Sequence, residues 1–316
     1  MSFFQLPSRS KCRYLWTKCD YAGIVQNYES NAFYRKLCVS GIRKLDLDSI
    51  YLSALLQLHR EEDVLRHRSV IEKLRESEML AYRLELNRFA IESMHIAPTK
   101  TMAKAYDAIK AMPRLLNIEE FWKDYHEVEK IAVVGNAPVS MLNGEEIDSA
   151  DLVIRFNKFR IAGYEKYIGT KTDVWCHICD VRTDSELKEL YSSVQNIILT
   201  DNPLTVPVGE QFLDDILNSN KTIYNIPQNA VERMSTMLGA IPSSGARVLI
   251  SLASSCSNLR NKTKIFGFSF LDRTKKIDNF DHYFEKIQKG EKTHNIQNEI
   301  TTLRSFFSGS STLKVG

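Results

Sequence analysis

The sequence lacks the marks of several large protein classes. Its longest apolar runs, such as residues 248–253, are far too short to span a bilayer, and its N-terminus has no continuous apolar segment typical of a secretory signal. The net charge of +3 is too slight for a nucleic-acid partner, whose binding site would be strongly basic. Six cysteines in 316 residues do not form a disulfide scaffold. What is left is an ordinary globular protein, expected in the cytoplasm.

Two of the cysteines form a lone C-x-x-C, Cys176 and Cys179, within the run VWCHICD. A zinc site would need a second pair of ligands at suitable spacing, and no such pair is evident. A redox role stays open. The apolar surroundings favour two buried cysteines that pack as small hydrophobic residues.

Glycine is almost absent from the first 127 residues, where apolar residues recur at helical spacing. We expect three helices between residues 47 and 93, marked by Leu47, Tyr51, Leu55 and Leu58, by Val64, Ile71 and Leu74, and by Tyr82, Leu86 and Phe89. Asp46 or Asp48 is the expected N-cap of the first helix. Residues 1–127 are therefore predicted to form a helical N-terminal domain or extension.

After residue 127, short β-rich runs alternate with helical ones. The expected strands are 131–134, 152–155, 173–176, 196–200, 222–225 and 264–268, and the expected helices include 209–218, 229–238 and 245–255. This alternation predicts an α/β domain over residues 128–316 with a largely parallel sheet. Ligands of such sheets bind outside the carboxyl ends of the strands, so motifs that directly follow strands are the functional candidates.

Two motifs place asparagines at such strand ends. VVGNAP at 133–138 runs from a strand into Gly135 and Asn136, where glycine allows a sharp turn and a close ligand approach. IDSADLVIRFN at 147–157 ends a second strand at Asn157. Each motif alone could be a plain strand-to-turn junction, and the three-glycine fingerprint of dinucleotide binders is missing. Together, the two amides predict a neutral polar cradle for a nucleotide.

Three further motifs follow along the chain. PSSGARVLISLA at 242–253 opens an apolar helix with Ser243, Ser244 and Gly245, which is either a plain serine cap or an anion site at a helix N-terminus. The run KIFGFSF follows at 264–270. HYFE at 282–285 and the pair His294 and Glu299 bring two histidines and two glutamates within 18 residues. Histidine suits general base catalysis near neutral pH.

In this order, the motifs resemble the four sialylmotifs of the eukaryotic-type sialyltransferase family. Residues 131–173 resemble motif L, residues 242–270 motif S, residues 282–285 motif III, and His294 with Glu299 motif VS. The resemblance covers about residues 128–305. It implies a Rossmann-like, GT-A-like fold and a glycosyltransferase that moves sialic acid from CMP-sialic acid to a glycan hydroxyl, with inversion and without a metal.

The resemblance also implies roles for single residues. It assigns His294 as the general base and His282 as a contact to the phosphate of the departing CMP, with Glu299 in support. It assigns donor binding to six residues: Gly135, Asn136, Asn157, Ser243, Ser244 and Gly245. Many sugar transferases hold a metal with a D-x-D motif, but the D-L-D at residues 46–48 lies in the helical part and is interpreted as a cap. No metal and no cofactor are expected.

Two departures from the family concern location. Its animal members have a membrane anchor, and this sequence shows no apolar run long enough to form one. They also have a disulfide between motifs L and S, but Ile131 stands at the motif L position, so Cys256 has no partner there. Both departures indicate a cytoplasmic bacterial enzyme that builds a surface glycan such as lipooligosaccharide, capsule or O-antigen. Inner-membrane contact and homo-oligomer formation stay open. So do a CMP-Kdo donor and a non-catalytic nucleotide-binding module.

Overall fold

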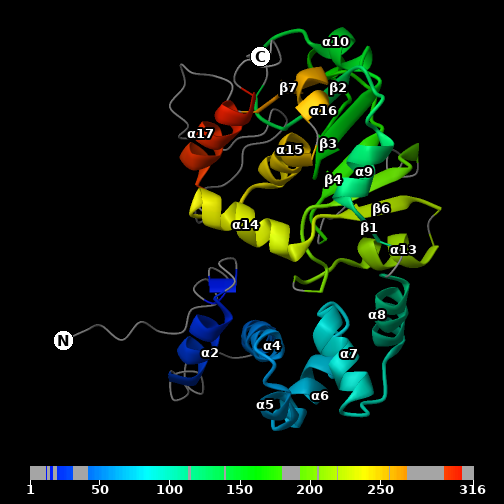
Figure 1. Ribbon diagram of the computed structural model, residues 1–316. Helices are drawn as coiled ribbons and strands as arrows, with labels where there is room; N and C mark the ends of the chain where they lie inside the picture. The colour runs from blue at the N-terminus through cyan, green and yellow to red at the C-terminus, as the bar shows by residue number, and fades with distance from the viewer. Residues whose placement is uncertain are drawn as a thin grey trace. The chain divides into compact units, whose positions relative to one another are not determined.

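The computed structural model of the protein (Figure 1) describes residues 12, 15, 16, 20–30, 42–112, 115–138, 140–179, 193–204, 206–218, 220–255, 257–268 and 295–307. The chain divides into two compact units. The helical unit is Met1–Met112 with Pro203–Asn218, and the sheet unit is Pro113–Asn202 with Ser219–Gly316. The sequence placed this division near residue 127. In the structure, residues 113–127 group with the sheet, because they supply its edge strand and a helix that packs on it.

The helical unit contains α2 (Tyr21–Ser30), α4 (Ile42–Gln57), α5 (Glu61–Leu65), α6 (Arg68–Glu76), α7 (Leu84–Glu92), α8 (Lys100–Ala111) and α13 (Glu210–Asn218). The first and third expected helices are α4 and α7. The second is interrupted at Arg66 and His67, which separate α5 from α6. Apolar residues at helical spacing are buried in each of these helices, Val64 and Ile71 among them, as the pattern predicted.

The expected capping role of Asp46 and Asp48 is wrong. Helix α4 begins at Ile42, so both carboxylates lie within its first turns and not before them. Both residues are buried: Asp48 accepts a hydrogen bond from Tyr28 Oη, and Asp46 lies 3.8 Å from a guanidinium nitrogen of Arg83. The D-L-D segment is therefore internal polar packing of the helical unit, because buried carboxylates need such partners.

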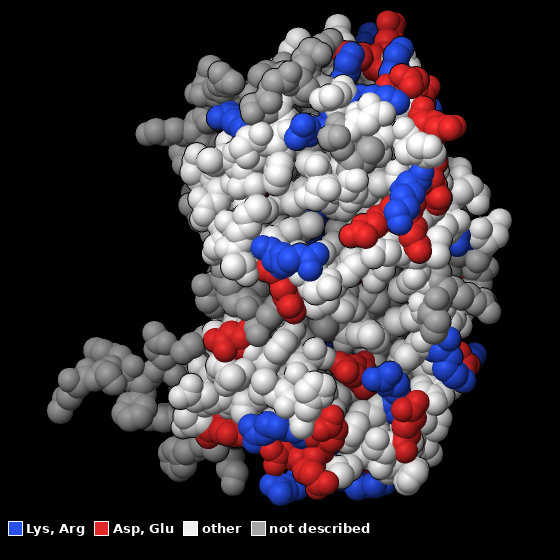
Figure 2. Space-filling model, in the orientation of Figure 1, with Lys and Arg blue, Asp and Glu red and all other residues white. Residues whose placement is uncertain are grey.

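The charges of the helical unit are largely paired with one another. Arg60 and Arg66 both contact Asp63, and Arg68 lies 3.9 Å from Glu72. Figure 2 shows acidic and basic side chains interspersed on the visible face. Ion pairs that are this exposed add little stability. Among the described residues, no helix combines the length and the apolar character that a membrane span requires.

The sheet unit is built on seven strands, all parallel, in the order β1-β6-β5-β4-β3-β2-β7. These are β1 (Leu116–Asn117), β2 (Ile131–Val134), β3 (Leu152–Phe156), β4 (Val174–His177), β5 (Asn196–Leu199), β6 (Thr222–Asn225) and β7 (Thr263–Phe266). The predicted α/β class and parallel sheet are confirmed. Only β1 was not expected, since two residues carry no periodic signal.

Both faces of the sheet are buried. Side chains alternate between the two faces along each strand, so the strands contribute to two cores. Val133, Ile154 and Cys176 face one core, which α9 (Ile118–Asp124), α14 (Gln228–Leu238), α15 (Ser244–Ser255) and α17 (Ile296–Phe307) help to form (Figure 1). Ala132, Val153 and Phe266 face a second core with residues of α10 (Gly144–Asp148) and α11 (Glu165–Ile168). Helix α16 (Ser257–Lys262) leads into β7. Within the first core, Trp122 Nε1 donates to Ser251 Oγ at 3.0 Å and ties α9 to α15.

Candidate functional site

The strand order defines one point where the sheet changes direction. From β2 to β6 the chain adds strands on one side, and β7 then returns to the other side of β2. Ligands of parallel sheets bind at such a switch point, at the carboxyl ends of the strands. Gly135 and Asn136 follow β2 there, and Gly267 follows β7. The motif predicted from sequence therefore lies where the topology favours a ligand site.

Gly135 and Gly267 bring two backbones into close contact at this point. A Cβ on Gly135 would lie 2.5 Å from the Gly267 carbonyl oxygen, and Ala137 N donates to that same oxygen at 2.7 Å. The ring of Phe268 fills the space beside two glycines: a Cβ would lie 2.8 Å from it at Gly135 and 2.4 Å from it at Gly245. The sequence explained these glycines by ligand approach. In the structure, the close neighbours are the chain's own backbone and one aromatic ring.

The side chain of Asn136 is oriented by two carbonyl groups. Its Nδ2 donates to the carbonyl oxygens of Phe156 at 2.9 Å and Lys158 at 3.0 Å. Two acceptors fix the amide orientation, because only the NH2 end can satisfy both. Both amide hydrogens are thereby used, and Oδ1 is left as an acceptor. Asn136 can thus accept a hydrogen bond from a hydroxyl or amino group of a ligand. It has no side-chain N–H left to donate to a phosphate oxygen.

Asn157 has left-handed backbone geometry, with φ of 49°, which asparagine tolerates better than most residues. Its backbone N–H donates to Cys176 O at 2.7 Å, and its carbonyl accepts from Trp175 Nε1 at 2.8 Å. Its Oδ1 accepts from Ile178 N at 3.1 Å, while Nδ2 makes a long 3.5 Å contact to Ser244 Oγ. The end of β4 and the start of α15 hold this side chain, yet one Nδ2 hydrogen has no acceptor among the described residues.

Helix α15 begins beside these asparagines, and Ser243 caps it. Ser243 Oγ accepts from Ala246 N at 3.2 Å, so the simple capping interpretation is correct. Glu299 of α17 accepts from Ser243 N at 2.6 Å and from Ser243 Oγ at 2.8 Å. This links a predicted motif S residue to a predicted motif VS residue. Glu299, which was expected in a supporting role, thus has a specific partner in Ser243.

Three residues at this edge were missed by the sequence reasoning: Thr200, Asp201 and Arg247. Thr200 follows β5, is fully buried, and lies 3.1 Å from Ser244 Oγ through its own hydroxyl. Arg247 Nε donates to Pro242 O at 3.0 Å, and its Nη1 donates to Thr200 O and to Asp201 Oδ1. A charged residue inside the apolar run that follows Gly245 was the available signal.

His177 ends β4 and was also missed. Burial lowers the pKa of its imidazole to about 4, although the Ile178 carbonyl and Asp201 both favour the cation. Its Nδ1 lies 2.8 Å from Ile178 O, so the neutral ring carries its proton there. Nε2 is buried, with no hydrogen-bond partner among the described residues. The neighbouring Cys176 and Cys179 are buried thiols, as the small-hydrophobe interpretation predicted.

Two predicted catalytic residues, His282 and His294, lie outside the described residues, and their roles stay predictions. The six residues predicted to bind the donor all lie at or beside the carboxyl ends of the strands: Gly135, Asn136, Asn157, Ser243, Ser244 and Gly245. Over the described ranges, no group of three or more metal-ligating side chains occurs.

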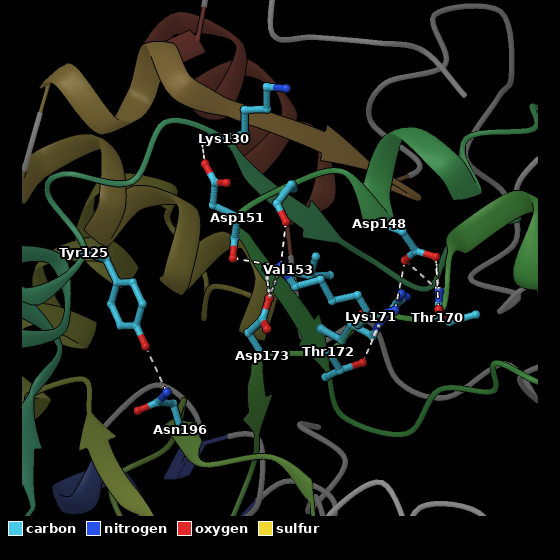
Figure 3. A network of polar contacts seen from close by, with 12 residues as sticks. Tyr125, Lys130, Asp148, Asp151, Val153, Thr170, Lys171, Thr172, Asp173 and Asn196 are labelled. Atoms are coloured by element: carbon cyan, nitrogen blue, oxygen red, sulfur yellow. Dashed lines mark hydrogen bonds and ion pairs between the residues drawn. The ribbon is translucent and has the colours of Figure 1, made fainter.

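A different polar network lies before the strands, at their amino ends (Figure 3). Asp148 accepts from Thr170 N at 2.8 Å and Lys171 N at 2.9 Å, Asp151 accepts from Lys130 N at 2.9 Å, and Asp173 accepts from Val153 N at 2.7 Å. Burial alone would raise the pKa of Asp148, but these N–H bonds hold it below its ordinary value. Much of the predicted motif L thus fixes loops to strands.

Known proteins similar to this chain are represented by one family model and two solved structures. The model of glycosyltransferase family 29 (sialyltransferase) matches residues 72–206. Two solved mammalian sialyltransferase structures are similar. One, in complex with Gal-beta-1-3GalNAc-ortho-nitrophenol, has 20% identity and a TM-score of 0.42 and covers 63% of this chain and 76% of its own. The other has 19% identity and a TM-score of 0.41 and covers 69% and 81%. No curated protein matches in sequence.

The resemblance to the sialyltransferase family is confirmed over residues 72–206 by the family match. The match begins at residue 72, inside the helical part, which the motif comparison had left out. It contains the whole of motif L and ends before motif S. The residues of motifs S, III and VS are therefore supported by their own pattern alone.

Proposed function

We propose that this protein transfers sialic acid from CMP-sialic acid to a glycan hydroxyl, by a metal-independent displacement that inverts the anomeric centre. The observation that carries the proposal is the carboxyl edge of a sheet in a sialyltransferase-family domain. There, Asn136, Asn157 and the start of α15 meet at the switch point. Such an edge is suited to a nucleotide whose ribose and base carry hydroxyl and amino hydrogens.

The donor's anionic part needs hydrogen-bond donors, and the start of α15 supplies them. The backbone N–H groups of Ser244 and Gly245 have no acceptor among the described residues, and they lie at the positive end of a 12-residue helix. Glu299 already occupies Ser243 N, so one donor of this helix end is used. The phosphate or the sugar carboxylate would bind the N–H groups that follow Ser243.

The chemical step needs one base and one stabilised leaving group. In the proposed reaction, the acceptor hydroxyl gives its proton to His294 as its oxygen attacks the donor's anomeric carbon. The bond from that carbon to the phosphate oxygen breaks, and CMP leaves as an anion that His282 contacts. Preorganised donors aimed at that phosphate lower the barrier, on the order of 3 kcal/mol for one well-placed group. A lipid-linked surface glycan is the acceptor that we infer.

CMP release by the purified protein tests this function. CMP-Neu5Ac and CMP-Kdo are supplied separately, with and without EDTA. We expect release from CMP-Neu5Ac that EDTA leaves unchanged. Release from CMP-Kdo alone would replace the sugar and keep the enzyme class. Loss of activity in EDTA would contradict the metal-free step. Absence of release together with absence of CMP binding by calorimetry would favour a non-catalytic module.

The base is tested by His294→Ala. We expect turnover to fall at least 100-fold, since general base catalysis contributes about 10²–10⁴-fold. CMP affinity measured by calorimetry should stay near the wild-type value. His126→Ala, at an exposed histidine of the sheet unit, is the matched control and should keep full turnover. Wild-type turnover in His294→Ala would remove the assignment of the base.

A further inference from the structure

Arg247 is a buried cation in the first turn of α15, and only 8% of its surface is exposed. A buried guanidinium is costly unless its N–H groups are bonded. Here Nε donates to Pro242 O at 3.0 Å, and Nη1 donates to Thr200 O and to Asp201 Oδ1. One side chain therefore joins the loop before α15 to the segment that follows β5.

The residue that Arg247 holds leads directly to the predicted donor site. Thr200 is fixed through its carbonyl by Arg247 and through its N–H by His177 O at 3.0 Å. Its hydroxyl lies 3.1 Å from Ser244 Oγ, which in turn accepts the 3.5 Å contact from Asn157 Nδ2. Arg247, Thr200, Ser244 and Asn157 thus form a continuous chain of hydrogen bonds, here called the Arg247 chain.

We propose that Arg247 is a positioning residue for donor binding, which acts through Thr200 to set the orientation of the Ser244 hydroxyl and the Asn157 amide. The proposal rests on the proposed function, since the ligand positioned is the CMP part of the donor. Arg247 itself need not touch the donor. Its planar guanidinium presents donors in a fixed fork to two carbonyls and a carboxylate, a geometry that the single ammonium of lysine does not reproduce.

Asp201 completes the pair by balancing the charge of Arg247. Its side chain is more exposed than that of Arg247, at 21% against 9%. An asparagine at this position would keep an oxygen for Nη1 and lose only the charge. If orientation by hydrogen bonds is what matters, Asp201→Asn should change CMP affinity by no more than about twofold, and removal of the guanidinium should change it much more.

The test compares CMP affinity, donor KM and melting temperature in four variants: Arg247→Lys, Arg247→Met, Thr200→Val and the double variant Arg247→Lys/Thr200→Val. The matched control is Arg155→Lys. Arg155 is also buried and also donates to backbone carbonyls, those of Lys171 and Ile168, but it does so in the loop network before β4. Arg247→Lys and Arg155→Lys should both have a lower melting temperature than the wild type.

We expect Arg247→Met to weaken CMP binding about tenfold and Arg247→Lys to weaken it less, with donor KM raised and acceptor KM unchanged. Arg155→Lys should keep the wild-type affinity. The double variant should be no weaker than the worse single variant, because both changes act on one chain of bonds. Arg247→Lys provides the result if Arg247→Met fails to fold.

Wild-type CMP affinity and donor KM in a folded Arg247→Lys variant would overturn the inference and leave the sialyltransferase function standing. Strictly additive effects of the Arg247 and Thr200 changes would overturn it too. Failure of the wild-type protein to bind CMP would instead contradict the proposed function, and this inference with it. An equal loss of affinity in Arg155→Lys would show a general effect of stability and refute positioning.

Discussion

At the amino ends of the strands, Asp148, Asp151 and Asp173 accept backbone N–H groups (Figure 3). At the carboxyl ends, Asn136 and Asn157 use amide groups, and they are not fully bonded. The first network has charged acceptors bound to fixed backbone donors. The second has neutral amides that bond to backbone groups and to one hydroxyl, and each keeps an acceptor or a donor in reserve.

The difference teaches how one motif can serve two purposes. A carboxylate with several N–H partners is satisfied, and it stabilises the loop that supplies them. A part-buried amide that keeps an unused acceptor or donor can bond a ligand that supplies the missing partner. Changes at the amino ends should therefore lower stability, and changes at the carboxyl ends should lower donor affinity.

The largest effect expected from this comparison is that of Asp148→Ala. The variant loses the acceptor of Thr170 N and Lys171 N, and we expect a loss of about 2 kcal/mol in the free energy of unfolding. Because the folded-state pKa is lowered, the contribution of Asp148 is present above the pKa of the unfolded chain and is lost as pH falls through the folded value. Urea unfolding at pH 7 and pH 3 should show a smaller difference from wild type at pH 3. A marked loss of CMP affinity would break the comparison.

A smaller effect is expected for Asn136→Asp. A carboxylate cannot donate to the carbonyls of Phe156 and Lys158 and would face them with like partial charge. Calorimetry should show CMP binding weakened about tenfold, a change of about 1.4 kcal/mol. The matched control is Asn196→Asp at the amino edge, where Asn196 Nδ2 donates to Tyr125 Oη at 2.9 Å. Equal CMP affinity in Asn136→Asp and Asn196→Asp would contradict a role of Asn136 in binding the CMP donor.

The smallest effect concerns His177→Gln. The folded-state pKa of about 4 lies below the unfolded value near 6.5, so the unfolded chain takes up a proton that the folded chain does not. Stability should be complete above pH 6.5 and should fall as pH drops toward 4, by about 1 kcal/mol between pH 7.5 and 6. The variant should lack this part of the pH dependence, and His126→Gln, at an exposed site, should keep it. An unchanged acid slope in His177→Gln would mean that His177 is not buried as a neutral ring.

The sheet was predictable because its strands carry strong local signals. The runs at 131–134 and 222–225 match β2 and β6 to the residue, since apolar β-branched segments bounded by turns leave little choice. The break between α5 and α6 was missed because Arg66 and His67 suit a helix interior by propensity. The Arg247 chain could not be predicted from the sequence, because Arg247 reaches a residue 47 positions away through a backbone carbonyl.

Asn136 and Asn157 were expected at neighbouring strand ends, and the parallel pairing of β2 with β3 places them there. That both Nδ2 hydrogens of Asn136 are used depends on the carbonyls of Phe156 and Lys158, whose positions follow from the tertiary fold. The position of the Phe268 ring beside Gly135 and Gly245 also follows from the tertiary fold, so the sequence did not predict it.

The connection from β5 to β6 affects how this protein can be divided into folded fragments. Its helix α13 belongs to the helical unit, where it packs on α8, and Lys104 pairs with Asp214 at 2.7 Å. Val208 N also donates to Tyr82 O at 3.0 Å. A fragment that begins at residue 113 would keep α13 and lose these partners, exposing the apolar side chains of Phe212 and Leu213. The two units are thus interleaved in the amino-acid sequence. A fragment made by truncating the chain at a single position cannot contain either unit complete and alone.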